Sequence, residues 1–475
     1  MENRPRSPSR RPIRFLAWLL FAAVTGYCCL LPGLTVVRDL QDDAIRGPGI
    51  PRLAWRLHRD ITPRFESWAR ARVASGSAAY VELHDVPTTE WPIFSAVFYL
   101  MATEQLQATW DAGDHAGGES PMHYAAGAVA AARDLVTDPV HHTWVRTHWG
   151  GDYMHRENVF FRSLVIAALA SHERLTHDRS SLPMLEDQVD TLTQALDESD
   201  RGVLNDYPGE CYPIDVVAGE GMMRHADAVL GTDHSAFFAR SARAFTGPMA
   251  DSLGLVPYRM DVESGDQIQP SRGIGNSWVS VFAPDLWPDR ARDWYGRYEA
   301  SFWQDHTWAA GFREYAKGTP DSEWLTEVDA GPVIDGFGTS ASAFGIAAAR
   351  RNGRFDHAYT LSSQMLAVSW PMPDGSLLAP RMLSHAADAP YLGEAAILYF
   401  LTVQPAEGVP VVTGGRTPWL VYLALLAYFG PTALVLSRVA AWARRSHSSR
   451  KERRQERKGK RAGLGMEPAR ATTTL

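Results

Sequence analysis

The 475-residue sequence is poor in cysteine. It has only three, and two of them, Cys28 and Cys29, lie inside a long apolar run. Cys211 is therefore the single cysteine of the main body, so no disulfide can form within that body. The 16 histidines include no HExxH pair or comparable ligand spacing, and we expect no metal site.

Positive charge is also scarce through most of the chain. Between Arg38 and Val412 there are about 29 basic and about 50 acidic side chains, a net charge of about −21. Nucleic acid is an unsuitable partner for such a body, because binding phosphates requires the opposite sign. The remaining basic residues are concentrated at the two ends of the chain.

Two apolar runs without charge stand apart, at residues 15–37 and 417–437. Each slightly exceeds the roughly 20 residues that a helix needs to cross a bilayer, so we interpret both as transmembrane helices. A cleavable signal peptide is the alternative for the first run, but the run is longer than a usual signal core and no clear small-x-small cleavage site follows it.

The flanks of these runs predict the topology. Five arginines precede the first run and RRSHSSRKERRQERKGKR follows the second, so residues 1–14 and 438–475 are expected to be cytoplasmic. The body between them is then extracytoplasmic, either periplasmic or on the cell surface. The basic tail is also expected to contact anionic membrane lipid.

Strand-like alternation is almost missing from about Trp91 onward, and helical patterns follow one another. A helix that is apolar nearly all round, a tight turn and an amphipathic helix recur at residues 155–175 with 182–196, 214–230 with 236–245, and 337–350 with 358–368. Such hairpins predict an all-α fold, an (α/α)6 toroid of eleven or twelve helices in two rings. Residues 38–89 are assigned to a linker and the first helices.

The loops before the inner helices are expected to gather at one end of the central cavity. In one of them His155 opens the helical stretch HRENVFFRSL, with Asp152 three residues before it. A histidine near a carboxylate at such a place suits a general acid or base near neutral pH. A capping or core-packed histidine is the alternative interpretation.

A second loop, DYPGECYPID, carries Asp206 and Asp215 nine residues apart. Two carboxylates in different surroundings can divide the acid and base roles of a lyase or hydrolase. The alternative for Asp215 is that it caps the helix it begins. Cys211 between them is expected to be a small buried thiol rather than a nucleophile, since no Cys-His spacing accompanies it. Glu90 and Tyr258 are further candidates, with a helix cap and a packed aromatic as their alternatives.

Four stretches resemble, in order and spacing, the linalool dehydratase/isomerase family: HRENVFFRSLVIAALASHERLTHD, DYPGECYPIDVVAGEGMMRHADAVLGTDH, LVPYRMDVESG and EVDAGPVIDGFGTSASAFGIAAARRNGRFDH. The resemblance covers residues 90–406. It implies an (α/α)6 barrel, reversible hydration of an acyclic monoterpene, isomerisation of the allylic alcohol, and no metal or organic cofactor.

The resemblance also assigns individual positions. His155 falls where the family has its catalytic histidine, and Tyr258 lies near a pocket tyrosine. Asp206 and Asp215 stand where the family has cysteines, and Cys211 restores neither. We therefore predict His155, Asp206 and Asp215 as catalytic residues, and Glu90, Tyr258 and Cys211 as substrate-binding residues.

The expected function is a membrane-anchored, cofactor-independent lyase or isomerase that acts by acid/base chemistry on a small, hydroxylated, largely apolar molecule. A carbohydrate hydrolase or epimerase on the same toroid is one alternative, because paired acids also perform sugar chemistry. A non-catalytic ligand-binding or envelope-assembly module is another. A closed apolar cavity favours the first function, an open pocket with Trp and Tyr platforms favours a sugar, and carboxylates that face solvent favour the third.

Overall fold

The computed structural model describes residues 11–83, 85–328 and 330–463. Parts of the two basic ends, residues 1–10 and 464–475, lie outside the described residues. The chain divides into two compact units, Leu34–Ala424 and a smaller unit drawn from Met1–Gly33 and Leu425–Leu475. Each unit is described by itself.

The larger unit contains a closed ring of inner helices. Among the described residues these are α5 (Trp91–Asp111), α8 (Val159–Thr176), α10 (Pro213–Leu230), α12 (Gly273–Leu286), α14 (Thr339–Arg351) and α17 (Leu392–Thr402). Each packs against the next, and α17 packs against α5. Ring closure by six helices confirms the predicted all-α toroid.

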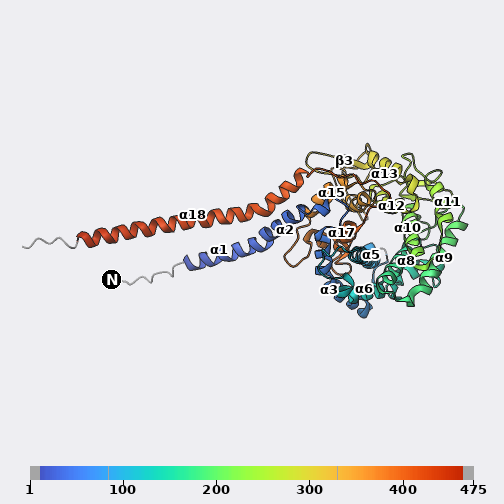
Figure 1. Ribbon diagram of the computed structural model, residues 1–475, viewed down its shortest axis with the longest axis horizontal. Helices are drawn as coiled ribbons and strands as arrows, with labels where there is room; N and C mark the ends of the chain where they lie inside the picture. Colours follow the sequence, from blue (N-terminus) through green and yellow to red (C-terminus); the bar gives the residue numbers. More distant parts are fainter. Residues whose placement is uncertain (1–10, 84, 329, 464–475) are drawn as a thin grey trace, which may run out of the picture. The chain divides into compact units, whose positions relative to one another are not determined.

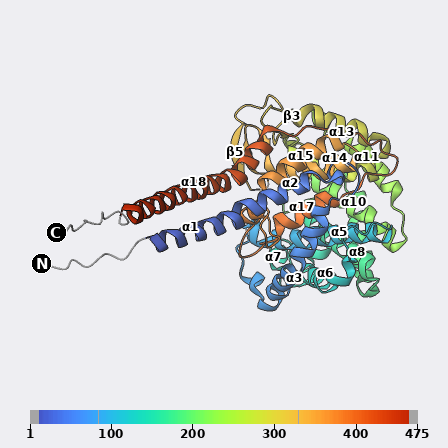
Figure 2. The ribbon, with the colours of Figure 1, turned by 60° about the vertical axis from the view of Figure 1, so that its left-hand side comes forward.

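An outer layer covers this ring. Its described helices are α3 (Arg52–Ser75), α6 (Pro121–Thr137), α9 (Leu182–Glu198), α11 (Ser235–Phe245), α13 (Pro288–Phe302) and α15 (Phe355–Val368). In Figure 1, α9, α11 and α13 lie outside α8, α10 and α12. Helix α3 packs against α6 and α17, beside the point of closure (Figure 2). Helix α3 of the outer layer thus lies within residues 38–89, which were expected to hold a linker and the first helices.

The burial of one hairpin shows why the two layers separate. Nearly every residue of α8 is buried, as its apolar sequence predicts. In α9, by contrast, the buried apolar residues form one stripe, Leu185, Val189, Leu192 and Leu196, on a helix whose other face is charged. A helix that is apolar all round needs neighbours on every side, whereas a single stripe needs a neighbour on one side only.

The connections between these helices hold short elements. The helical ones are α4 (Val86–Thr89), α7 (Thr143–Trp149), α16 (Leu378–Leu383) and the 3₁₀ turns η2 (Asp43–Ile45), η3 (Ser77–Tyr80), η4 (Tyr153–His155) and η5 (Arg179–Ser181). The strands are β1 (Arg259–Met260) paired with β2 (Gln267–Gln269), β3 (Trp303–Asp305) paired with β4 (Ala310–Phe312), and the antiparallel set β5 (Trp324–Glu327), β6 (Gly331–Ile334) and β7 (Phe337–Gly338). They are too short to form a sheet-based core.

Aromatic rings fill the middle of the toroid. Phe98 of α5 lies 6.0 Å from Trp278 of α12 and 5.6 Å from Tyr399 of α17, measured between ring centroids. Phe344 of α14 joins the same cluster, 5.2 Å from Trp278. Because α5 and α12 are three places apart in a ring of six, these contacts cross the axis. The centre is therefore a packed apolar core.

The smaller unit contains α1 (Arg11–Thr25), the π-helical turn η1 (Gly26–Leu30) and parts of α2 (Leu31–Leu40) and α18 (Trp419–Gly463). Two helical stretches, Leu16–Leu40 and Trp419–Ala441, are long and apolar enough to span a membrane. They coincide with the predicted spans at 15–37 and 417–437. Within this unit Gly33 packs so closely that a Cβ there would lie 2.8 Å from Cβ of Tyr428, the close approach that small residues permit between apolar helices.

Candidate active site

The loop between α9 and α10 forms a tight turn. Tyr207–Pro208–Gly209–Glu210 has a proline second and a glycine with φ of 79° third, as in a type II β-turn, and the Glu210 amide donates to the Tyr207 carbonyl at 2.8 Å. Pro213 then begins α10, in the helix position where a missing N–H costs nothing. The turn thus places Asp206 before it and Asp215 after it.

Asp206 is buried, with 2% of its surface exposed. One carboxylate oxygen, Oδ1, accepts a hydrogen bond from the Phe160 amide at 2.9 Å, and the other, Oδ2, accepts from the Tyr212 amide at 2.8 Å. Burial, and next the charge of Asp215, raise the pKa of Asp206 well above its ordinary value, against the two amide hydrogen bonds. Asp206 therefore holds the loop to the start of α8 and also favours a proton.

Asp215 lies in the first turn of α10 and lines a small pocket. Other lining residues come from four inner helices: Phe94, Phe160, Ser163, Met222 and Trp278. The pocket volume is about 10 Å³, which is the space of roughly one water molecule. Asp215 therefore faces a small and largely apolar pocket, and its charge also acts on the buried Asp206.

Two of the residues predicted to bind substrate lie around this loop. Glu90 directly precedes α5, and its charge contributes to the raised pKa of Asp206. The Tyr258 ring is buried and meets the Tyr212 ring edge to face, with 5.4 Å between centroids.

Cys211 is fully buried, and its carbonyl accepts a hydrogen bond from the Met260 amide at 3.1 Å. Burial raises the pKa of its thiol, which is then protonated at neutral pH and inert as a nucleophile. This matches the expected small buried thiol, and a role of Cys211 in substrate binding stays a prediction.

His155 lies elsewhere than expected. Helix α8 begins at Val159, after Asn158 with φ of 38°, so His155 ends the separate turn η4. The imidazole is 45% exposed, with Nδ1 2.9 Å from Asp152 and Nε2 3.1 Å from Asp187 of the outer helix α9. These contacts, the Asp152 hydrogen bond first, raise the pKa of His155. His155 is not among the residues that line the Asp215 pocket, and its catalytic role stays a prediction.

A buried ion pair at the start of α12 was missed. Arg272 Nε donates to Glu314 at 2.7 Å, another of its nitrogens pairs with Glu327, and its guanidinium lies 4.4 Å from the centroid of the Tyr258 ring. Burial raises the pKa of Glu314 to about 7. No sequence pattern pointed to the pairing of Arg272 with Glu314, which is 42 residues further along.

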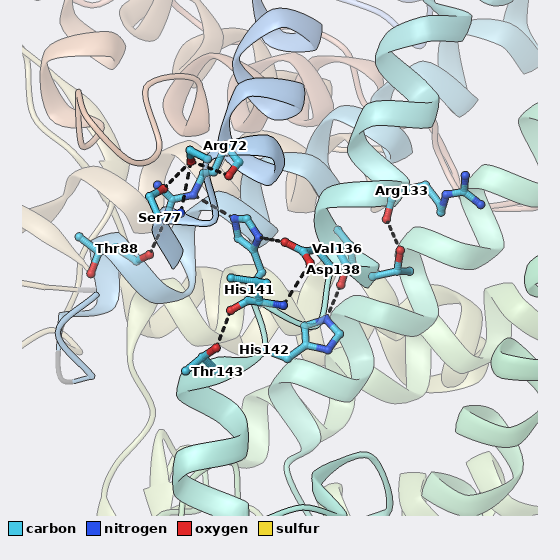
Figure 3. A network of polar contacts seen from close by, with 12 residues as sticks. Arg72, Ser77, Thr88, Arg133, Val136, Asp138, His141, His142 and Thr143 are labelled. Carbon is cyan, nitrogen blue, oxygen red and sulfur yellow. Dashed lines mark hydrogen bonds and ion pairs between the residues drawn. The ribbon is translucent and has the colours of Figure 1, made fainter. Parts of the chain in front are cut away.

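A polar network holds the segment before Glu90 (Figure 3). Arg72 of α3 donates to the Thr88 carbonyl at 3.1 Å and to His141 Nε2 at 3.0 Å, and it also pairs with Asp388. Because His141 Nε2 accepts, its Nδ1 donates to Asp138 at 2.9 Å. The network ties α4 to the toroid two residues from Glu90. In the described part of the chain no three His, Cys, Asp or Glu side chains are grouped as a metal site would require.

Comparisons with known proteins give little more. No family model matches the sequence, and no curated protein matches it. Among solved structures, a family 76 glycoside hydrolase from a bovine Bacteroides thetaiotaomicron strain aligns over 71% of this chain and 76% of its own, with 10% identity and a TM-score of 0.35. A similarity of this size carries no information on chemistry, so the site itself has to suggest the function.

Proposed function

We propose that this protein is a membrane-anchored lyase or isomerase that needs no cofactor and acts by acid/base chemistry on a small, hydroxylated, largely apolar molecule. The observation that carries the proposal is the interacting pair Asp206 and Asp215, with Asp206 buried and Asp215 at an aromatic pocket. His155 is not needed in this scheme.

The pair provides both halves of a dehydration. Two carboxyl groups that repel each other's charge in a largely buried site keep one proton between them near neutral pH. That proton goes to the hydroxyl oxygen of the substrate, the C–O bond breaks, and water leaves. The pair then accepts a proton from the neighbouring carbon, whose C–H electrons form the double bond. The reverse sequence adds water, and addition at the other end of an allylic system isomerises the alcohol.

The pocket favours an apolar substrate over a sugar. Its walls are Phe94, Phe160, Met222 and Trp278, and Ser163 is the hydroxyl group among them. A sugar would leave most of its hydroxyls without partners against such walls, which is costly. Because the pocket holds about one water, a larger substrate can bind only if the lining side chains move.

Oxygen exchange tests this proposal on many candidate substrates at once. Purified protein is incubated with a panel of small acyclic and allylic alcohols in ¹⁸O-labelled water, and recovered alcohols are analysed by mass spectrometry. Reversible dehydration places ¹⁸O in a true substrate. Asp215→Asn should reduce the rate by about a hundredfold or more, because general acid/base groups contribute that much. Asp190→Asn on the exposed face of α9 makes the same charge change and should leave the rate unaltered.

The same experiment separates the alternatives. A panel of glycosides is run in parallel, and release of reducing sugar without exchange in any alcohol would replace the lyase with a carbohydrate hydrolase. Ligand binding that Asp215→Asn weakens, with no turnover in either panel, would make the protein a binding module.

A further inference from the structure

A second and larger pocket lies in the Leu34–Ala424 unit, with a volume of about 190 Å³. Its walls come from α2, α3 and the turn at residues 371–377 and include Thr35, Arg38, Leu53, Arg56, Asp60 and Met372. None of these residues lines the Asp215 pocket. The chemistry proposed above therefore makes no use of this second pocket.

Asp60 gives the pocket an acidic side. It is half-buried on α3, and among the described residues its carboxylate has no hydrogen bond or ion pair. Burial raises its pKa, although Arg56, Arg64 and Arg59 oppose that shift. Gly375, with φ of 83°, lies so close that a Cβ there would be 2.4 Å from Cβ of Asp60. The backbone of the turn thus packs directly against Asp60, which presents a half-buried carboxylate to the pocket.

Two arginines line the same pocket. Arg38 and Arg56 both bind Asp39, at 3.1 and 2.5 Å, and Asp39 is only 3% exposed. Arg38 itself is 59% exposed and keeps donors that Asp39 does not use. The buried Asp39 thus holds two guanidinium groups in place. The same pocket contains the unpaired carboxylate of Asp60.

The pocket includes the end of a helix that is apolar enough to span a membrane, which points to the membrane as the source of its ligand. Thr35 and Arg38 belong to the last turns of Leu16–Leu40, the first of the two stretches apolar enough to span a membrane. The end of such a helix lies at the level of lipid headgroups. Leu53, Leu57 and Met372 line the same pocket and offer contact to an apolar chain.

We propose that this pocket binds the headgroup of a membrane phospholipid that carries a primary amine beside its phosphate. The phosphate binds Arg38 and Arg56, the ammonium group binds Asp60, and the first carbons of the lipid lie along Leu53 and Met372. Opposite charges in one site match a zwitterion. A purely anionic headgroup would leave the Asp60 carboxylate unpaired and would be repelled by it.

Calorimetric titration of the full chain in a non-ionic detergent tests this site. Three probes are compared: dihexanoyl phosphatidylethanolamine, dihexanoyl phosphatidylglycerol and free phosphoethanolamine. We expect the ethanolamine lipid to bind about tenfold or more tightly than the glycerol lipid, which lacks the amine. We expect free phosphoethanolamine to bind about tenfold or more weakly than its lipid, because it makes no apolar contact.

Two variants assign the contacts. Asp60→Asn removes the charge with little change of shape and should abolish the preference for the ethanolamine lipid. Arg38→Gln should weaken both lipids about tenfold, since both carry the phosphate. Asp293→Asn and Arg297→Gln, which alter an exposed pair on α13, repeat the charge changes and should leave all three affinities unaltered.

Three results would overturn the proposal. One is an undiminished ethanolamine preference in Asp60→Asn, and another is equal or tighter binding of the glycerol lipid to the wild-type chain. The third is equal affinity for free phosphoethanolamine, which would make the ligand a soluble phosphate ester. Because binding is measured without turnover, the outcome is independent of the oxygen-exchange experiment.

Discussion

Both carboxylate oxygens of Asp206 are occupied, since each accepts a backbone amide hydrogen. Replacing Asp206 by asparagine turns one of these accepting oxygens into an NH₂ group. That group then faces a backbone N–H, so two donors meet and neither has an acceptor. Asp215, by contrast, lines the pocket from the first turn of α10. The two aspartates of the loop therefore have different roles. Asp206 holds the backbone and sets the local charge, and Asp215 is placed to contact the substrate.

This difference predicts unequal effects on stability. Asp206→Asn should lower the free energy of unfolding by about 1–3 kcal/mol, the cost of a buried donor without a partner. Asp215→Asn should change it by clearly less. Denaturant unfolding of the two variants and the wild type in the same detergent measures this, and a larger loss in Asp215→Asn would contradict the structural role of Asp206.

A pH dependence is predicted from Glu220. It is fully buried on α10, its Oε1 accepts from the Ser241 hydroxyl of α11, and burial raises its pKa to about 8. The unfolded chain has the ordinary pKa of about 4.3, so the folded state binds the extra proton. The stability that protonated Glu220 contributes is complete below about pH 4.3 and is lost as the pH rises through about 8.

Glu220→Gln keeps the shape and removes the titration. The melting temperatures of the variant and the wild type should differ least near pH 5. Above that, the melting temperature of the variant should rise steadily relative to that of the wild type, up to about pH 8.5. The gain in free energy of unfolding should be on the order of a few kcal/mol. A constant difference across this range would show that Glu220 does not titrate between these pH values.

At the scale of elements, α3 is expected to be a structural part of the toroid's outer layer. Phe65 of α3 is fully buried and stacks on Tyr99 of α5 with 4.3 Å between centroids. Phe65→Ala should therefore cost about 3–5 kcal/mol of unfolding free energy, measured by denaturant unfolding. Tyr80, an exposed aromatic residue shortly after α3, supplies the matched control, and Tyr80→Ala should cost almost nothing. Equal effects of the two changes would mean that α3 is peripheral.

The helical hairpins could be predicted because their periodicity is local. Residues 182–196 have an amphipathic pattern, and α9 spans Leu182–Glu198. The role of α3 could not be predicted in this way, since its partners α6 and α17 lie far along the chain. The start of α8 was placed early because the left-handed backbone of Asn158 has no clear sequence signal.

The candidate site shows the same limit. Asp206 and Asp215 are close in sequence, and Pro208 and Gly209 indicate the turn between them. The pairing of Arg272 with Glu314 depends on how the connection between α13 and α14 folds back, which no local pattern encodes. For His155 the sequence supplied the residue and its neighbour Asp152, but not the direction of the side chain or its contact with Asp187.

For the whole molecule, the testable expectation is topology. If the basic ends set the orientation, a tag after Leu475 should be protected in intact cells, and a tag between Asp178 and Leu182, in the exposed turn η5, should be accessible from outside. Protease treatment of intact and permeabilised cells detects both tags. A protected tag in η5 would place the toroid on the cytoplasmic side.

The closure of α17 on α5 has a consequence for biosynthesis. Roughly 280 residues separate the end of α5 from the start of α17, and at about 5–20 residues per second their synthesis takes on the order of 15–60 s. Throughout that interval Phe98 and its neighbours on α5 have no partner from α17, so an apolar surface stays uncovered while the chain is still growing. Protection by a chaperone is therefore needed most before residue 392 has emerged, and chains that terminate before that residue are expected to aggregate or be degraded.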